Sequence, residues 1–237
     1  MEDESTTGLV AQNGLARDIF GGLSASYDSV LDWLTLFQDR KWKSRMLQKL
    51  EMREGARVLD IGCGTCVLEE KYPLKASEVV GIDLTNGMIR LAQQKSLESV
   101  SMLGLADAEH LPFKDGSFDV VVSCYVPKYC DTRGFVEELA RVLKPGGRAA
   151  IYDFTMPRGF FGPLLNLYIF GFIPVFGRLV STLDSSLAFT CGALPGLIRS
   201  TTWDDEISLA FERYDLSSGG REAMTGGVVT VFWASKQ

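Results

Sequence analysis

The chain of 237 residues contains little that could bind a metal. It has one histidine, His110, and five cysteines, at positions 63, 66, 124, 130 and 191. Only Cys63 and Cys66 form a Cys-x-x-Cys pair, and neither a second pair nor a histidine accompanies it. Structural zinc sites need four such ligands at defined spacings, so we expect no metal. The odd cysteine count and the lack of a signal peptide predict a reducing, cytoplasmic location.

Basic residues are also scarce relative to acidic ones. Lys and Arg number 24 against 30 Asp and Glu, which gives a formal net charge of −6. A chain of this balance lacks the basic surface that nucleic-acid binding requires, so nucleic acid is excluded as the main partner. The sequence is 46% hydrophobic and 23% charged, without repeats or low-complexity tracts. This composition predicts a single globular domain over residues 1–237.

Long apolar runs are absent with one exception. Residues 160–177 carry no charge, and this length is the lower limit for a transmembrane helix. Pro163, Pro174 and several glycines interrupt the run and argue against a straight helix. We therefore expect a hydrophobic lid insertion over 157–199 that contacts the inner face of a membrane without spanning it. The segment 40–45 holds four cations in six positions, and it is expected to help orient the protein on an anionic bilayer.

The segment VLDIGCGT, residues 58–65, is the most informative part of the chain. Its apolar start predicts a strand buried on both faces, and Gly62 and Gly64 allow the backbone to turn sharply against a ligand. There is no third glycine and no Gly-Lys-Ser/Thr ending, so dinucleotide and phosphate-loop sites do not match. Asp60 would repel a pyrophosphate but could accept from an ammonium group. The turn thus predicts a cationic ligand without phosphate, such as S-adenosylmethionine (SAM).

Two further acids follow the next two predicted strands. Asp83 ends the strand 78–83, about 20 residues past the glycine turn, where an acid takes ribose hydroxyls in open α/β sheets. Asp107 follows the strand 101–106 and could accept from an adenine amino group. One such Asp alone is more typical of a helix cap or a turn. Together with Asp60, three at successive strand ends favour a SAM site.

Strands and helices alternate from Gly55 onward. This alternation predicts a doubly wound, mainly parallel α/β sheet. Residues 1–50 are expected to form an N-terminal helical region, 51–156 the SAM-binding core, 157–199 the lid, and 200–237 a C-terminal helix with strands. The expected strands are 57–61, 78–83, 101–106, 118–124, 148–154 and 228–234; helices are expected between 15 and 49, at 86–94, from the cap Asp131 to 143, and from a capping box formed by Thr202 and Asp205.

The motifs as a set resemble class I SAM-dependent methyltransferases. They are VLDIGCGT, VVGIDLTNGMI, ADAEHLPF, FDVVVS and RVLKPGGR, between residues 55 and 155. The flanks resemble the ubiquinone/menaquinone biosynthesis C-methyltransferase family, in Tyr27-Asp28, in QDRKW at 38–42 and in MTGGVV at 224–229. The resemblance implies a seven-stranded, Rossmann-like sheet. It also implies SAM as cofactor and, as substrate, a prenylated quinol methylated on a ring carbon in respiratory quinone biosynthesis.

The resemblance also assigns site residues by position. The expected SAM contacts are Asp60, Gly62, Gly64, Thr65, Asp83, Met88, Asp107, Ala108 and Cys124. The chain departs from the family at three places. Cys66 replaces the last glycine of the loop, Cys124 stands where a bacterial relative has serine, and residues 126–129, VPKY, replace a Gly-Leu-Arg-Asn segment next to the substrate. The last departure leaves the proton-transfer groups and the identity of the quinol open.

The implied reaction needs help with a proton. A quinol carbon is a weak nucleophile until a neighbouring hydroxyl ionises, and a phenol-like pKa of about 10 leaves little phenolate at neutral pH. His110, Asp153 and, through a water, Asp28 are candidate bases, while Lys128 could stabilise the phenolate. Each also has a plain structural reading, as a loop, turn or surface residue. Tyr27, Tyr129 and Tyr168 are candidates for the acceptor pocket, although aromatic residues on helices more often form core.

Two other functions remain open at this point. The first is N-methylation of a phospholipid headgroup or another hydrophobic small molecule, because such enzymes share the same SAM-binding core. The second is a SAM-binding protein without catalysis, which the altered segment 126–129 favours. The expected partner is in each case a hydrophobic small molecule, and the sequence leaves the oligomeric state open.

Overall fold

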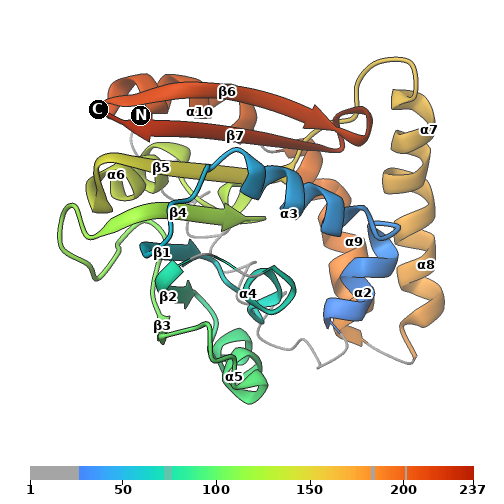
Figure 1. Ribbon diagram of the computed structural model, residues 1–237. Helices are drawn as coiled ribbons and strands as arrows, with labels where there is room; N and C mark the ends of the chain where they lie inside the picture. The colour runs from blue at the N-terminus through green and yellow to red at the C-terminus, as the bar shows by residue number, and fades with distance from the viewer. Residues whose placement is uncertain (1–26, 73, 75, 183–184, 201) are drawn as a thin grey trace, which may run out of the picture.

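The computed structural model describes residues 27–72, 74, 76–182, 185–200 and 202–237. In this part of the chain, seven strands form one sheet in the order β3-β2-β1-β4-β5-β7-β6 (Figure 1). Neighbours among β1 to β5 run parallel, whereas β7 runs antiparallel to both β5 and β6. The strands are β1 (Ala56–Ile61), β2 (Ala76–Asp83), β3 (Met102–Leu105), β4 (Phe118–Cys124), β5 (Leu143–Phe154), β6 (Leu216–Met224) and β7 (Val229–Lys236).

This strand order confirms the doubly wound, mainly parallel fold class. The chain builds outward from β1 to β3, then returns to place β4 on the other side of β1. The loops that leave β1 and β4 therefore diverge, and ligands bind at such a switch point, outside the carboxyl ends of the strands. The topology alone thus directs attention to the turn after Ile61 and the loop after Cys124.

Helices cover both faces of the sheet. Val58 and Leu59 point to opposite faces, and both are fully buried, which explains why the strands are continuously apolar. On one face, α6 (Thr132–Val142) and α10 (Trp203–Arg213) pack against Leu59 and its neighbours. On the other, α3 (Gln38–Gln48) packs against Val58. The shorter α2 (Tyr27–Leu34) and α4 (Val67–Lys71) precede and follow β1, and α5 (Asn86–Lys95) follows β2.

A helical hairpin forms between β5 and α10, within the insertion expected over 157–199. It consists of α7 (Gly162–Leu167), the π-helical segment η2 (Tyr168–Phe172), α8 (Ile173–Val180) and α9 (Ser185–Ser200). Figure 1 shows α7 and α8 as one column beside α9. The two ends of the insertion are fastened together, because the indole Nε1 of Trp203 donates to the carbonyl of Phe154 at 2.9 Å.

The prolines do not break this column as expected. Pro163 lies in the first turn of α7, where its missing N–H leaves no bond unmade. Pro174 lies in the first turn of α8, directly after η2, and the wider π-helical turn absorbs the change in backbone hydrogen bonding. Gly177 is needed where α8 meets α9, because a Cβ there would lie 2.5 Å from the Cβ of Cys191.

The segment 40–45 does not present all its cations at the surface, and its role on a membrane stays a prediction. Trp42 and Lys43 are only 3% and 5% exposed, since they lie on the face of α3 that packs onto the sheet. Arg40 pairs with Asp32 and Arg45 with Glu222 on the surface. The spacing of the charges on one helix does not reveal that one of them points inward.

Several local expectations can be compared directly. Strand β4 spans the expected residues, and the Asp131 carboxylate caps α6 by accepting from the backbone N of Gly134 at 2.9 Å. The capping box at Thr202 is wrong, because its hydroxyl donates to Glu206 at 2.7 Å and makes no cap bond. Strand β6 has no counterpart among the expected ranges. Helices expected between residues 15 and 26 lie outside the described residues.

Candidate active site

The glycine turn after β1 is held in place from two sides. Gly62 and Gly64 adopt positive φ angles of 75° and 55°, which glycine tolerates at no steric cost. A Cβ on Gly62 would lie 2.1 Å from Cγ2 of Val126, so the loop after β4 closes directly over the turn. On the other side, the Asp83 carboxylate at the end of β2 accepts from the backbone N of Gly64 at 3.0 Å.

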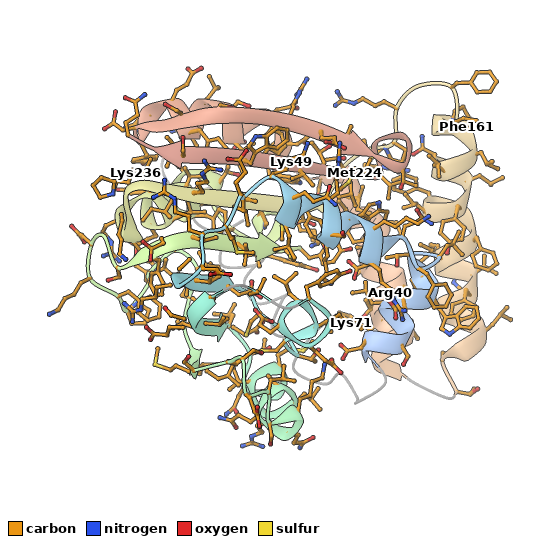
Figure 2. The ribbon with its side chains drawn as sticks, viewed as in Figure 1. Arg40, Lys49, Lys71, Phe161, Met224 and Lys236 are labelled. Carbon is orange, nitrogen blue, oxygen red and sulfur yellow. The ribbon has the colours of Figure 1, made fainter. Side chains whose placement is uncertain are left out.

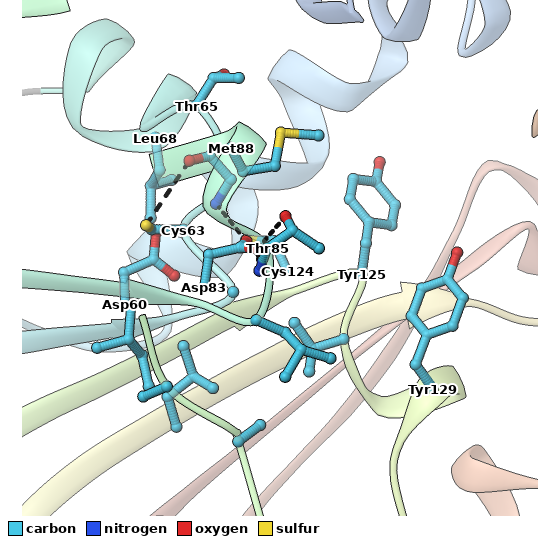
Figure 3. Close-up of a pocket in the computed structure, with 18 of the residues that line it drawn as sticks. Asp60, Cys63, Thr65, Leu68, Asp83, Thr85, Met88, Cys124, Tyr125 and Tyr129 are labelled. Carbon is cyan, nitrogen blue, oxygen red and sulfur yellow. Dashed lines mark hydrogen bonds between the residues drawn. The ribbon is translucent and has the colours of Figure 1, made fainter. Parts of the chain in front are cut away.

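A cavity opens at this turn, across the carboxyl ends of the parallel strands (Figure 3). Its empty space is about 970 Å³ with the open mouth included. All nine expected SAM contacts line it, which brings together residues from four separate strand ends. They are Asp60, Gly62, Gly64, Thr65, Asp83, Met88, Asp107, Ala108 and Cys124.

One end of the cavity offers acceptors for sugar and base. Asp83 is fixed by Thr85, whose backbone N and hydroxyl both donate to it at 2.8 Å. Burial raises the pKa of Asp83, and these hydrogen bonds oppose the rise. Asp107 is oriented by the backbone N of Glu109 at 3.0 Å. Met88 is buried between them and gives this end an apolar surface.

The other end of the cavity holds opposite charges. Asp60 is 2% exposed, and its Oδ1 has no hydrogen-bond partner among the described residues. Lys43 from α3 also lines the cavity and is the one cationic side chain among the described lining residues. Sequence reasoning missed Lys43, although its position one residue after the family-like Trp42 marked the right helix. Thr65 is held by a 2.6 Å bond from its hydroxyl to Asp28.

Asp39 organises this end from behind the cavity wall. Its Oδ1 accepts from the hydroxyls of Tyr125 at 2.7 Å and Tyr152 at 2.8 Å, and its Oδ2 accepts from Lys43 Nζ at 2.6 Å. The three donors come from the loop after β4, from β5 and from α3. Tyr125 lines the cavity with a positive φ of 66°, an unusual backbone for a bulky residue. Burial, with the Asp39 charge beside it, raises the pKa of Tyr125 well above its ordinary value.

The expected catalytic residues Lys128 and Asp153 are paired with each other. Lys128 Nζ lies 2.8 Å from Asp153 Oδ1, and both side chains are buried. Asp153 also accepts from the backbone N of Lys128 at 3.1 Å and of Phe154 at 2.7 Å. Burial lowers the pKa of Lys128 and raises that of Asp153. Neither side chain lines the cavity, so the pair joins the loop after β4 to β5 behind it.

The other candidates are spread more widely. The side chain of His110 is 84% exposed and 3.9 Å from Asp107, outside the cavity lining. Tyr129 lines the cavity, in the view of Figure 3 near Tyr125 and across from Asp60. Tyr168 instead belongs to the hairpin, where its hydroxyl donates to the carbonyl of Leu34 at 3.0 Å. Tyr27 begins α2, but its side chain lies outside the described part of the chain.

Comparison with known sequences identifies relatives over most of the chain. The ubiE/COQ5 methyltransferase family matches residues 8–236. A relative from Corynebacterium glutamicum (strain R), named demethylmenaquinone methyltransferase, is 29% identical over 220 residues, which cover 92% of each chain. A relative from Geobacter sulfurreducens, named ubiquinone/menaquinone biosynthesis C-methyltransferase UbiE, is 28% identical over 229 residues, or 93% of this chain and 88% of its own.

Solved structures agree on the fold. A SAM-dependent methyltransferase from Aquifex aeolicus superposes with a TM-score of 0.56 at 20% identity, covering 82% of this chain and 89% of its own. Geranyl diphosphate C-methyltransferase from Streptomyces coelicolor A3(2), solved with S-adenosylhomocysteine, gives 0.56 at 12% identity and covers 84% and 77%. These likenesses confirm the Rossmann-like architecture.

We expect Asp83→Asn to weaken SAM binding. The variant keeps the size of the side chain but replaces a charged acceptor with a neutral one, and a hydrogen bond to a charged group contributes about 1.5–3 kcal/mol. Calorimetry should therefore show a Kd roughly 10- to 150-fold higher. Asp115→Asn, in the exposed loop before β4, is the matched control and should leave the Kd unchanged. An unaltered Kd in Asp83→Asn would remove Asp83 from the site.

Proposed function

The chain belongs to the ubiE/COQ5 methyltransferase family, and from that membership we propose that it methylates a ring carbon of a prenylated quinol in respiratory quinone biosynthesis. It is a SAM-dependent methyltransferase with a hydrophobic small molecule as acceptor. The observation that carries the quinol proposal is the family match over 8–236, which includes the flanks as well as the SAM-binding core. We further propose that residues 1–237 act as one domain, with the hairpin as its lid.

The cavity supports one orientation of SAM. The adenine would lie at Asp107 and Ala108, the ribose hydroxyls on Asp83, and the methionine part over Gly62 and Gly64. Thr65, Met88 and Cys124 would complete the contacts. In this orientation the α-ammonium group of SAM meets Asp60.

Lys43 suits the α-carboxylate of the same methionine part. Its ammonium is fixed by Asp39, and its charge acts on both Asp60 and Cys124. Burial lowers the pKa of Lys43, but the charge and the hydrogen bond of Asp39, together with the other acidic neighbours, outweigh burial and raise the pKa, so Lys43 stays protonated. Because the ammonium and carboxylate of SAM share one carbon, a lysine beside Asp60 matches this zwitterion.

The acceptor ring would enter on the side of Tyr125 and Tyr129. Attack by the ring carbon forms a C–C bond to the methyl group while the C–S bond breaks, which leaves S-adenosylhomocysteine. The ring proton then departs and the quinol regains its aromaticity. The sulfonium and the Lys43 ammonium both place positive charge in the cavity, which favours the phenolate form of the quinol.

The Lys128–Asp153 pair acts in this proposal as a positioning element. Asp153 does not line the cavity and already accepts three hydrogen bonds, so it is not placed to take a proton from the acceptor. The Lys128 ammonium lies 4.4 Å from the ring centroid of Tyr129, which lines the cavity. The pair thereby holds Tyr129 against the acceptor ring. His110 lies too exposed to reach the reacting atoms in this arrangement.

The outer surface of the hairpin supports contact with a membrane at the cytoplasmic face. Phe160 is 91% exposed, and further large apolar side chains follow it along the column. Figure 2 shows Phe161 at the outer end of α7, and Trp33 in α2 is likewise exposed. The bond from Tyr168 to Leu34 joins the two elements. The exposed set is Trp33, Leu36, Phe37, Phe160, Phe161, Leu164, Leu167, Phe172, Val175 and Leu179.

The opposite side of the same column is bound to the protein. Ile169 and Ile173 are buried in the core between the hairpin and the sheet. Among the described residues, Gly162–Leu179 is long and apolar enough to cross a membrane by length and composition only, which is weak evidence for a span. A helix that buries one side on its own sheet cannot also be surrounded by lipid. We therefore propose that the hairpin lies on the bilayer, where long-tailed quinols reside.

The acceptor can be tested with purified protein, SAM carrying a labelled methyl group, and a reduced demethylated quinol with a prenyl tail. The expected product carries the label on a ring carbon, located by mass spectrometry. The oxidised quinone should give no product, because its ring carbon is not nucleophilic. Phosphatidylethanolamine tests the alternative. Labelled phospholipid with unlabelled quinol would overturn the proposal and favour N-methylation.

Loss of Lys43 should abolish recognition of the α-carboxylate. Wild-type protein is expected to bind S-adenosylhomocysteine at least roughly tenfold more tightly than its decarboxylated analogue. This is the difference in affinity that one hydrogen bond between charged groups contributes. Lys43→Met should bind the two alike. Because this variant leaves Asp39 buried without its cation, Asp39→Asn/Lys43→Met provides a second background, and the exposed Lys41→Met is the control. A full preference for the carboxylate in both Lys43 variants would refute the assignment.

Polar substitutions on the outer face of the hairpin should weaken membrane binding. We expect Leu164→Gln, Leu167→Gln and Leu179→Gln together to lower affinity for anionic vesicles at least roughly tenfold, since burying one Leu contributes about 1.5 kcal/mol or more. Methylation of a long-tailed quinol in vesicles should slow, and that of a short-tailed, soluble analogue should not. Leu209→Gln, equally exposed on the remote α10, is the control. Unchanged vesicle binding in the triple variant would contradict the membrane proposal.

A further inference from the structure

Two carboxyl groups without hydrogen-bond donors lie together beside the SAM cavity. Asp60 ends β1 and lines the cavity, and Glu69 lies in α4; they are 2% and 5% exposed. Asp60 Oδ1 and both carboxyl oxygens of Glu69 have no donor among the described residues. Two ionised carboxylates left in this state would be costly. The arrangement therefore requires a proton, a cationic ligand, or each at a different stage.

The two groups are close enough to satisfy one another when one holds a proton. The two carboxyl groups are neighbours that act directly on one another. Burial raises the pKa of both, and for Asp60 the charge of Glu69 raises it further. Neighbouring carboxyls of this kind titrate as a pair that retains one proton.

The surrounding charged groups do not remove the need for that proton. Lys43 from α3 acts on both carboxyls, but its ammonium is held by Asp39 at 2.6 Å. Lys95 from α5 acts on Glu69 but is bound to Asp28 at 2.7 Å and Glu70 at 2.6 Å. Neither lysine donates a hydrogen bond to Asp60 Oδ1 or to Glu69 within the described part of the chain.

We propose that Asp60 and Glu69 share one proton in the SAM-free enzyme, and that the α-ammonium group of SAM displaces this proton when it binds. Asp60 is the member of the pair that lines the cavity, so it meets the ammonium, while Glu69 lies behind it and gives up the proton. The inference rests on the orientation of SAM proposed above. It makes Glu69 a positioning residue that couples cofactor binding to pH.

The sign of the effect follows from the proton count. The free pair binds one more proton than the SAM-bound pair, so binding releases a proton and tightens as pH rises. Above about pH 8 the amino group of the ligand itself loses its proton, which reverses the trend. The coupling is therefore expected between about pH 6 and pH 7.5, with up to a tenfold gain in affinity per pH unit.

Isothermal titration calorimetry of the full chain with S-adenosylhomocysteine tests this coupling. Titrations at pH 6.5 in buffers of different ionisation enthalpy give the number of protons released on binding. Wild-type protein should release more than half a proton per ligand. 5′-Methylthioadenosine, which shares the adenosine part but has no ammonium group, should release none. This second ligand also controls for any proton released by His110, because His110 lies beside Asp107 and both ligands carry the same adenosine part.

Glu69→Gln should bind S-adenosylhomocysteine with little proton release and an almost flat pH dependence. Glu70→Gln is the matched control, because its carboxylate lies on the surface and bonds to Lys95; it should behave as wild type. Equal proton release in wild type and Glu69→Gln, or equal release with both ligands, would overturn the inference. Should Glu69→Gln fail to fold, the difference in proton release between the two ligands on wild-type protein still tests the inference. Unchanged affinity in Asp60→Asn would overturn the SAM orientation as well as the coupling.

Discussion

The buried carboxylate of Asp39 is the interaction on which the rest of the site depends. It accepts hydrogen bonds from Tyr125, Tyr152 and Lys43, which come from three different elements. An unpaired carboxylate at this depth would be strongly destabilising, so α3 can dock on the sheet only where all three donors are present. That docking places Lys43 in the cavity wall and holds Tyr125 in its unusual backbone conformation. The N-terminal helix is therefore part of the cofactor site, not an appendage to it.

The parallel half of the sheet could be predicted because its strands are buried on both faces. A run such as VLDI or FDVVVS needs no long-range partner to be recognised as a strand. Strand β6 is different: within the described residues it lies at the edge of the sheet and pairs with β7 alone, and its sequence is LSSGGREAM. It is a strand because β7 offers a hydrogen-bonding edge, and no local pattern conveys that. The helical column around the hairpin prolines could not be predicted either, because the π-helical turn before Pro174 has no recognisable local sequence pattern.

The expected SAM contacts could be predicted from the sequence, whereas the surroundings of the catalytic candidates could not. Residues at strand ends are positioned by topology alone, so once the strands are recognised their side chains converge, as all nine do here. Lys128 and Asp153 lie 25 positions apart, and their mutual burial depends on how the loop after β4 meets β5. The sequence predicts a surface position for Lys43 for a related reason. Its neighbours Arg40 and Arg45 do face solvent, and only the packing of Trp42 reveals which face of α3 is inward.

The hydrogen bond from Trp203 to Phe154 divides the molecule into two parts. One is the frame, formed by the sheet and the helices packed on it, and the other is the hairpin between β5 and α10. Because the chain leaves the sheet and returns to it at one point, the hairpin between them can change in length, slope or composition without moving any strand. In the proposed arrangement, every SAM contact lies in the frame, and most of the contact with the membrane lies in the hairpin. Variation in this one segment can therefore adapt the enzyme to a new membrane while SAM binding is preserved. The fold thus allows membrane attachment and cofactor binding to evolve independently of each other.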